Sequence, residues 1–333
     1  MNETKFSVII LIYNTKIEYI DLAINSVLNQ DYQNYEIVMI DDGSNEKVKQ
    51  YISRYENDKR FVIHHQENKG MVKSSMQGLK LATGDYIVYL DFDDYLNPHS
   101  LSIVNSIIVE HNVDVVMVNH VRFTNDINEI TEHTPYFKEG FVDKEEVLKQ
   151  LCLLHTNTAW SRIGKRQLYE GMEEHLNLDL INGEDVQQST YVILNAESFY
   201  YTNEIIYYYR LIEEHRDYYD VKNMNDTNFM VPMYNMIFES NKHDNLLPIF
   251  KTSAANSITY NSFRMCLWIK DHDERIKLLN QLNEQEICKI TSSIKAKMPL
   301  VSEILFYLFR KKHYFLLRMA AKLYDLIYGM DII

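Results

Sequence analysis

The sequence predicts an α/β protein with a mostly parallel β-sheet that is covered by helices on both faces. Over the first 120 residues, short runs rich in β-branched and aromatic residues alternate with segments of helical spacing. The runs are apolar almost throughout, which is typical of strands buried on both faces of a parallel sheet. The chain has 333 residues, 46% of them hydrophobic, which is enough for one large domain or two ordinary ones.

Five runs are predicted as strands of this sheet, namely FSVIILI (6–12), YEIVMI (35–40), FVIHH (61–65), DYIVYL (85–90) and DVVMV (114–118). Most of the intervals between them have helical spacing. After the first run, apolar residues recur at this spacing from Ile17 to Leu28, and Asn14 or Thr15 is the candidate N-cap. In such sheets, ligands bind at the carboxyl ends of the strands.

The last third of the chain, from about Asp220, is predicted to be helical. Its final stretch, residues 302–329, is predicted as one continuous helix that combines Leu, Phe and Tyr with the cations Arg310, Lys311, Lys312, Arg318 and Lys322. A basic, aromatic, amphipathic helix of this kind can lie on an anionic membrane surface. Packing against the first part of the chain, or against another subunit, explains the pattern equally well.

Composition and charge argue against several classes of protein. The formal net charge is −13, which argues against nucleic-acid binding as the main function of the chain. Cys152, Cys266 and Cys288 lie far apart without a CxxC pair, which indicates neither a disulfide framework nor a zinc site. MNETKFSVII contains no visible secretory signal, and no run approaches the roughly 18 apolar residues that span a bilayer. We therefore expect a cytoplasmic protein, with peripheral contact at the inner face of the cell membrane left open.

Polar clusters follow three of the predicted strands: YNT (13–15), DDGS (41–44) and DFDD (91–94). Aspartates this close together raise one another's pKa unless a cation or fixed donors hold them, so DFDD predicts a bound cation. Both acidic clusters have a plainer alternative, a turn that caps the following helix. The absence of GxGxxG and GxxxxGK[ST] argues against a dinucleotide site and a P-loop.

These stretches resemble the family 2 glycosyltransferases, which have a GT-A fold. The resemblance rests on SVIILIYN, SVLNQDYQNYEIVMIDDGS, QENKG, ATGDYIVYLDFDDYLNP and NGEDVQQSTYVI. It is continuous from about Phe6 to Pro98, continues more loosely through AWSRIGKRQLYE and IIYYYR to Arg210, and ends by about residue 220. It implies a GT-A catalytic domain over residues 1–215, with a donor half (1–120) and an acceptor half (121–215). The helical region at 216–333 would contact a membrane, the acceptor or another subunit.

The resemblance implies roles for residues at matching positions. Asp93 would bind a divalent metal, Mn²⁺ or Mg²⁺, that bridges the donor's diphosphate. Asp91 would contact the ribose or help to hold the metal, and Asp94 would orient either one. Asp41 would read the nucleobase, and Tyr13 would lie near the base or the ribose.

Three further residues complete the predicted donor-binding set: Asp42, Gly70 and Lys73. The sequence departs from the family pattern nearby, because Ser75 and Met76 stand where many relatives carry Arg–Asn. That arginine commonly helps to hold the donor. Its absence puts donor affinity in doubt, and Lys73 on the same stretch could supply the missing charge.

The GED motif supplies the predicted catalytic base, Asp185, with Glu184 beside it. A nucleoside diphosphate leaving group develops negative charge that Mg²⁺ or Mn²⁺ neutralises. An acceptor hydroxyl becomes a better nucleophile when a carboxylate receives its proton during the attack. Attack from the face opposite the leaving group inverts the anomeric centre in one step and needs no enzyme nucleophile. The plainer alternative is that the two acids only start a helix through its dipole.

Residues 141–215 are expected to complete the site. Trp160 could form an apolar wall against a sugar, and Arg162, Lys165 or Arg166 could meet phosphate. A buried Trp160 among solvated cations explains the same stretch equally well. Arg210, at the end of a tyrosine-rich segment, is a further candidate for the diphosphate or the acceptor.

The sequence thus predicts an inverting, metal-dependent glycosyltransferase, a hexosyl- or N-acetylhexosaminyl-transferase. It would move a sugar from a nucleotide-sugar donor, UDP-linked by resemblance, to a hydroxyl of a glycan or lipid-linked acceptor in polysaccharide, capsule or cell-wall synthesis. One alternative is a polyol-phosphate transferase on the same fold, which would release a nucleoside monophosphate. Another is a non-catalytic homologue that serves as a binding or partner subunit. Independently of the reaction, the C-terminal helices could form a peripheral membrane contact or a homo-oligomer.

Overall fold

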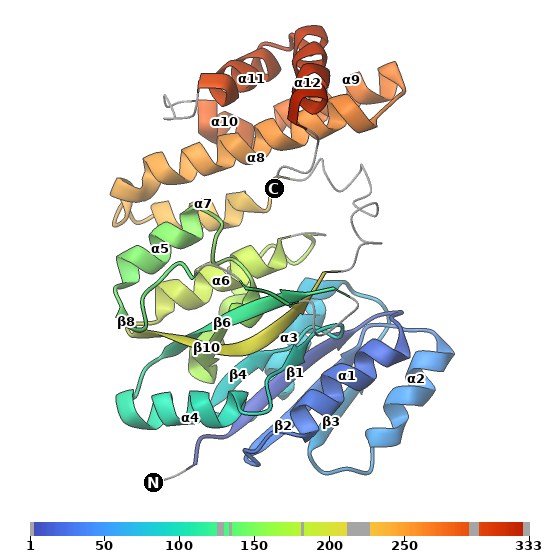
Figure 1. Ribbon diagram of the computed structural model, residues 1–333, viewed down its shortest axis with the longest axis vertical. Helices are drawn as coiled ribbons and strands as arrows, with labels where there is room; N and C mark the ends of the chain where they lie inside the picture. Colours follow the sequence, from blue (N-terminus) through green and yellow to red (C-terminus); the bar gives the residue numbers. More distant parts are fainter. Residues whose placement is uncertain are drawn as a thin grey trace. The chain divides into compact units, whose positions relative to one another are not determined.

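A computed structural model describes residues 3–124, 130–132, 135–180, 183–211, 227–292 and 300–328. The chain divides into two compact units, one of residues 1–151 with 155–213 and one of residues 152–154 with 214–333. Figure 1 labels most of the elements of both. The predicted site residues all lie in the first unit.

A ten-stranded sheet forms the centre of the first unit, with the strand order β3-β2-β1-β4-β9-β6-β10-β5. Strand β7 pairs with β6, and β8 pairs with β10. The strands are β1 Phe6–Ile12, β2 Tyr35–Asp41, β3 Phe61–His65, β4 Tyr86–Tyr89, β5 Tyr95–Leu96, β6 Val115–Phe123, β7 Ile130–Glu132, β8 Gly140–Val142, β9 Arg162–Lys165 and β10 Phe199–Arg210.

Strands β1 to β4 pair in parallel, as do β6 and β10, whereas β9 runs antiparallel between β4 and β6. Strand β2 is buried at every position, which explains its nearly continuous apolar sequence. Because β1, β2 and β4 are parallel neighbours, their carboxyl ends share one edge of the sheet. Tyr13, Asp41 and Asp91 therefore follow strands that end along this edge.

Helices cover both faces of the sheet, as predicted (Figure 1). They are α1 Ile17–Leu28, α2 Glu46–Ile52, α3 Met71–Leu81, α4 Ser100–His111, α5 Lys144–Cys152 and α6 Glu184–Asn195. On one face, the end of α1 meets the start of α4, where Gln30 donates to the carbonyl of Asn97 (2.6 Å). On the other face, α3 meets α6, where Ser75 donates to Gln188 (3.0 Å). The mostly parallel α/β sheet is thereby confirmed.

The predicted cap of the first helix was wrong. Helix α1 follows Lys16, which makes no side-chain capping bond. Asn14 instead accepts hydrogen bonds from the backbone and side-chain N–H groups of Asn45, at 2.8 and 3.0 Å. Asn45 itself caps α2 by accepting from the backbone N–H of Val48. The polar residue after β1 thus ties together two loops at the carboxyl edge of the sheet.

The second unit is helical over its described residues. Its helices are α7 Met230–Phe238, α8 Leu247–Trp268, α9 His272–Glu284, α10 Glu286–Ser292, α11 Leu300–Arg310 and α12 Tyr314–Tyr328. Helix α8 is the centre of this unit, because α7, α9, α10, α11 and α12 all contact it. None of the helices in the described ranges is both long and apolar enough to cross a membrane.

The prediction of one continuous final helix was wrong, because α11 and α12 are separated by a tight break. Lys312 takes the left-handed conformation, with φ of 59°. Its N–H donates to the carbonyl of Phe309, and the N–H of His313 donates to that of Leu308. This pair of bonds is the Schellman pattern that ends many helices. The pattern of apolar residues did not reveal it, since the break needs no glycine here.

Candidate active site

The structure brings together two acidic motifs that lie ninety residues apart in the sequence. The DFDD segment follows β4, and Glu184 and Asp185 form the first turn of α6. The carboxylates of Asp94, Asp185, Asp93 and Glu184 all repel the charge of Asp91. The sequence placed these motifs at a strand end and a helix start, and the fold turns them into one carboxylate cluster.

Asp91 is the member of this cluster on which the charges of four neighbouring carboxylates act. Its side chain keeps solvent-exposed surface, yet the protein atoms around it remove much of its hydration. This loss of water, and then the repulsion from the neighbouring carboxylates, raises the pKa of Asp91 well above its usual value. A bound cation would relieve both effects.

Asp94 differs from Asp91, because the protein supplies hydrogen-bond donors to its carboxylate. It is buried, and it accepts hydrogen bonds from the hydroxyl of Tyr207 (2.7 Å) and the backbone N–H of Arg210 (2.7 Å). Tyr207 also accepts from the backbone N–H of Asp91 (3.1 Å). Helix α4, in turn, begins after His99, without a side-chain cap. The aspartates are therefore fixed by β10, and they do not cap the next helix.

Arg210 lies directly beside the DFDD segment. Its Nε donates to the backbone carbonyl of Asp93 (2.7 Å). Its guanidinium lies over the rings of Tyr19 and Phe123, at 4.7 and 4.5 Å from their centres. Arg210 thus holds the backbone of the motif, and contact with a diphosphate or an acceptor stays a prediction.

Trp160 is only 6% exposed, which favours its interpretation as a core residue over a sugar platform. It stacks on Tyr207 with ring centres 4.4 Å apart and on Tyr209 at 5.6 Å, and His120 meets it edge-on at 4.8 Å. The tryptophan therefore supports Tyr207, which in turn holds Asp91 and Asp94. Its contribution to the site is indirect.

Glu184 and Asp185 differ in acidity although they are neighbours. Loss of hydration, together with repulsion from Asp185, raises the pKa of Glu184 to about 8. Loss of hydration also raises the pKa of Asp185, but only to about 6, because a backbone hydrogen bond from Ala159 and the positive charge of Arg162 favour its ionised form. The pKa of Glu184 is thus raised more strongly than that of Asp185, which makes Asp185 the better candidate to accept a proton.

Arg162 is 3% exposed and connects the cluster to a small cavity. Burial lowers its pKa to about 10, so it stays charged. One guanidinium nitrogen donates to the carbonyl of Thr156 and to Ser161. Within the described residues, its other terminal nitrogen and the hydroxyl of Thr156 find no hydrogen-bond partner. Because Arg162 is buried, its contact with phosphate stays a prediction.

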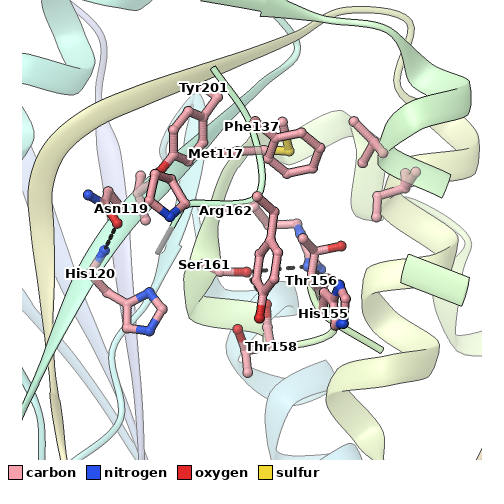
Figure 2. A pocket seen from close by; sticks show the side chains of 15 residues that line it. Met117, Asn119, His120, Phe137, His155, Thr156, Thr158, Ser161, Arg162 and Tyr201 are labelled. Atoms are coloured by element: carbon pink, nitrogen blue, oxygen red, sulfur yellow. Dashed lines mark hydrogen bonds between the residues drawn. The ribbon is translucent and has the colours of Figure 1, made fainter. Parts of the chain in front are cut away.

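The cavity that Arg162 lines is shown in Figure 2, between β6, β10 and residues 155–162. Its volume is about 50 Å³, the space of one or two water molecules. A water molecule there would satisfy the unpaired atoms of Arg162 and Thr156. A sugar ring does not fit, so this cavity is not the substrate site.

The second predicted acidic pair, Asp41 and Asp42, lies at the end of β2 and is buried. Asp41 accepts from the backbone N–H of Ser44 (2.8 Å), and its other oxygen lies 2.7 Å from Nδ1 of His65. Asp42 accepts from the side chain of Gln66 (2.7 Å) and from the backbone N–H groups of residues 69 and 70, at 2.8 and 2.9 Å. Five donors thus hold the two carboxylates.

The remaining predicted donor residues have mixed placements. Tyr13 follows β1 and is 49% exposed, so its ring is available to a ligand. Gly70 has φ of 85°, a left-handed conformation that favours glycine, just before α3. Lys73 lies 2.8 Å from Asp179 in an exposed ion pair. It must leave Asp179 before it can neutralise a donor.

Ser75, where the resemblance led us to expect an arginine, is buried and belongs to a neutral hydrogen-bond network. It lies 2.8 Å from the hydroxyl of Tyr89 and donates to Gln188 on α6. Met76 is buried as well. A charged side chain at position 75 would point into this packed contact between α3, β4 and α6. Ser75 and Met76 therefore fit the packing of this contact.

A metal ion fits the carboxylate cluster only with help from a ligand. In the described part of the chain, no group of three or more His, Cys, Asp or Glu side chains forms a ready metal site. Magnesium in nucleotide enzymes is held by one or two carboxylates together with substrate phosphates. Asp91 and Asp93 suit that arrangement, because they are hard oxygen ligands in a region of excess negative charge.

Sequence reasoning missed Tyr207 and His65 as parts of the site. The tyrosines of IIYYYR were noted only as a tyrosine-rich segment, and their sequence does not say which hydroxyl reaches the aspartates. His65 was predicted only as part of the strand FVIHH, and it orients Asp41. Periodicity in β10 gave no signal, since Ile206 and Tyr207 are both buried and Tyr208 and Tyr209 are both half-buried.

Comparison with known proteins identifies the family. Residues 7–172 match the family described as "Glycosyl transferase family 2". The chain belongs to glycosyltransferase family 2. Glycosyltransferase GlyA of Streptococcus pneumoniae is 26% identical to this family member over 224 residues, which are 63% of this chain and 31% of that protein.

A second relative matches more of this family 2 chain. It is the poly(ribitol-phosphate) beta-N-acetylglucosaminyltransferase TarS of Staphylococcus aureus, 24% identical over 308 residues, 88% of this chain and 52% of that protein. A crystal structure of TarS residues 1–349 in complex with UDP-GlcNAc has a TM-score of 0.71 and 22% identity, and the match covers 99% of this chain and 94% of that one. The fold is therefore GT-A. The chain spans about a third to a half of the length of these curated relatives.

Proposed function

We propose that this chain is an inverting, metal-dependent N-acetylhexosaminyltransferase that uses a UDP-sugar and a hydroxyl acceptor on a cell-wall glycan. The convergence of Asp91 and Asp93 with Asp185 carries the proposal. Asp91 and Asp93 suit the binding of a metal and a diphosphate, whereas Asp185 suits the acceptance of a proton. A sugar transfer from a nucleotide donor needs both within one site.

Asp185 is the proposed general base. Its pKa of about 6 leaves it ionised at neutral pH and still close enough to neutrality to accept a proton readily. Glu184, with a pKa of about 8, is protonated at the same pH and can donate a hydrogen bond to substrate. With Asp185 deprotonating the acceptor hydroxyl, attack on the anomeric carbon inverts its configuration in one step.

Mn²⁺ or Mg²⁺ is the proposed cofactor, and Asp91 and Asp93 would hold it. The ion would neutralise the charge that develops on the diphosphate as it leaves. Arg210 holds the backbone of Asp93, and Tyr207 holds that of Asp91, so neither carboxylate has to be ordered when the donor arrives.

The donor and acceptor classes are supported by the named relatives. TarS is named as an N-acetylglucosaminyltransferase that acts on poly(ribitol-phosphate), and one of its structures contains UDP-GlcNAc. We therefore propose UDP-GlcNAc as the first donor to test and a polyol-phosphate polymer as the first acceptor. Tyr13 would stack near the base or ribose, since its exposed ring lies at the carboxyl edge of the sheet.

The test is a donor screen with Mn²⁺ that identifies both the nucleotide released and the anomeric configuration of the product. The expected result is UDP release that depends on the acceptor and a product of inverted configuration. Release of a nucleoside monophosphate would replace the proposal with polyol-phosphate transfer. Nucleotide binding without turnover, across sugar donors and acceptors, would favour a non-catalytic subunit.

A further inference from the structure

Helices α11 and α12 expose large apolar side chains in a concentration that the rest of the described chain lacks. The nine residues are Leu300, Val301, Ile304, Tyr307, Phe315, Leu316, Met319, Leu323 and Leu326. We call this set the α11–α12 apolar face. Exposed apolar residues elsewhere in the described ranges are scattered over several elements. A concentrated patch of this kind marks an interaction surface.

The apolar face on α12 follows from helical geometry. At about 100° per residue, its five exposed residues fall within an arc of about 100°. The buried residues of this helix, Tyr314, Leu317 and Ala321, centre on the opposite side. Helix α12 contacts α8 and α11. It therefore has one apolar side for its own unit and a second that no described residue of this unit covers.

Helix α11 repeats this arrangement. Leu305 and Phe309 are buried, and the helix contacts α8 and α12. Its four exposed apolar residues centre about 130° away from these two around the helix. The two helices thus present apolar stripes next to each other, with the break at Lys312 between them.

Cations border the apolar face. Lys311 and Lys312 are exposed in the turn between the helices, and Lys322 is exposed about 20° from Phe315 around α12. Lys312 also lies 3.8 Å from Glu284, a surface pair of little energetic weight. Residues 300–328 contain five Lys or Arg and two Asp or Glu, which gives +3, whereas the whole chain carries −13. The rest of the chain is therefore −16, and this segment has the opposite sign.

We propose that the α11–α12 apolar face docks on the surface of an anionic lipid bilayer. Apolar side chains would enter the boundary between headgroups and acyl chains, while the lysines meet anionic headgroups. A symmetric dimer through the same face is disfavoured, because it would bring the three bordering lysines of one copy near those of the other. The helices would lie in the plane of the surface, since no described helix can cross a membrane.

The test is co-sedimentation of the whole chain with vesicles of phosphatidylcholine, with and without phosphatidylglycerol, at low and high salt. We expect binding to the phosphatidylglycerol vesicles that weakens as salt rises. Each lysine near an anionic surface is worth roughly a fivefold change in partitioning. The triple variant Lys311→Gln, Lys312→Gln, Lys322→Gln should therefore bind about a hundredfold more weakly.

Two further variants separate charge from apolar contact. Phe315→Ser, Met319→Ser and Leu323→Ser together should abolish vesicle binding at every salt concentration, because the apolar face is removed. Lys47→Gln, Lys59→Gln and Lys138→Gln change the net charge by the same amount at exposed sites outside the second unit. This control should bind like the wild type, and thermal melting of all variants checks that each one folds.

Several outcomes would overturn the proposal. They are wild-type protein that ignores phosphatidylglycerol vesicles at low salt, equal binding to both kinds of vesicle, and equal loss in the control variant. Light scattering that finds an oligomer, broken by the serine variant, in protein that binds no vesicles would assign the face to a second copy. Vesicle binding requires no transfer activity, so failure of the proposed function would leave this test unchanged.

Discussion

Two groups of acidic residues in the first unit have opposite environments. Asp41 and Asp42 are buried, and five hydrogen-bond donors hold them. In the cluster of Asp91, Glu184 and Asp185, loss of hydration raises the pKa of each carboxyl group, and repulsion between carboxylates adds to it for Asp91 and Glu184. Asp41 and Asp42 stabilise the loops around them, whereas the carboxylates of the second group lie in an unfavourable electrostatic environment.

The difference indicates where the chemistry lies. A buried carboxylate with its own donors is a structural element, because removing either partner leaves the other unsatisfied. Carboxylates without enough donors persist when a ligand or a metal completes them, and perturbed pKa values of this kind concentrate at functional sites. Changing carboxylates to amides in the two regions should therefore have opposite consequences.

The largest effect is expected in catalysis. Asp185→Asn should lower kcat by roughly 10²–10⁴, because the amide cannot accept the proton of the acceptor hydroxyl in the transition state. Donor affinity should stay near that of the wild type, since the base acts on the acceptor. Steady-state kinetics and nucleotide titration measure the two quantities separately. If affinity falls in step with the rate, Asp185 is a binding residue.

The next effect concerns nucleotide affinity. Asp93→Asn should weaken Mn²⁺-dependent binding of UDP by about tenfold to a hundredfold, since one metal ligand is lost. Its fold should be retained, because Arg210 contacts the backbone of Asp93 and the change is nearly isosteric. Calorimetry with and without Mn²⁺ measures the effect. Equal affinity in both proteins under both conditions would remove Asp93 from the metal site.

A smaller effect, on stability, should differ in sign between the two regions. Asp42→Asn should destabilise the fold by about 1–3 kcal/mol. The two carboxylate oxygens accept hydrogen bonds from Gln66 and from the N–H of Gly70, and an amide has only one oxygen that can accept. Glu184→Gln should stabilise it at pH 8 by about 1–2 kcal/mol, because a partly desolvated charge is removed. Denaturant unfolding at pH 8 measures both.

The pH dependence of the stability change gives a control for Glu184→Gln. A carboxyl group whose pKa is raised on folding favours the folded state at low pH, and this contribution is lost as pH rises through the folded pKa. For Glu184 the window runs from about 4.5 to about 8. The advantage of Glu184→Gln should therefore shrink as pH falls towards 4.5. An advantage that persists unchanged at that pH would have a cause other than the titration of Glu184.

Much of the fold was predictable because local patterns decide it. The buried strands β1 and β2 have sequences that only a covered parallel sheet accommodates. The break at Lys312 was not predictable, since a lysine with positive φ leaves no mark in the pattern of apolar residues. The N-cap of α1 failed for a similar reason, because Asn14 serves a contact with Asn45 that lies thirty-one residues away.

In the candidate site, residue types were predictable, and their partnerships were not. The acidic motifs stand out in the sequence by composition alone. Nothing in the sequence says that Tyr207 bridges Asp91 and Asp94, or that Asp41 is closed by His65. Such partnerships depend on sheet order and register, which bring β10 and β3 to these particular neighbours.

The smallest effect tests the link between Arg162 and the base. The positive charge of Arg162 lowers the pKa of Asp185, so Arg162→Met should raise it above its value of about 6. The acid limb of kcat/KM, which reports the free enzyme, should then move to higher pH by about half a unit. Arg162→Lys keeps the charge and should keep the limb near its original place.

The matched control is Arg166→Met, on the same segment. Arg166 is half-exposed and donates to the carbonyl of Gly84, away from the carboxylate cluster, so its loss should leave the pH profile unchanged. A merely structural role for Arg162 would lower the rate at every pH and leave the limb in place. An active Arg162→Met enzyme with the wild-type pH profile would therefore show that Asp185 does not depend on this charge, and that donors such as the backbone of Ala159 keep it ionised instead.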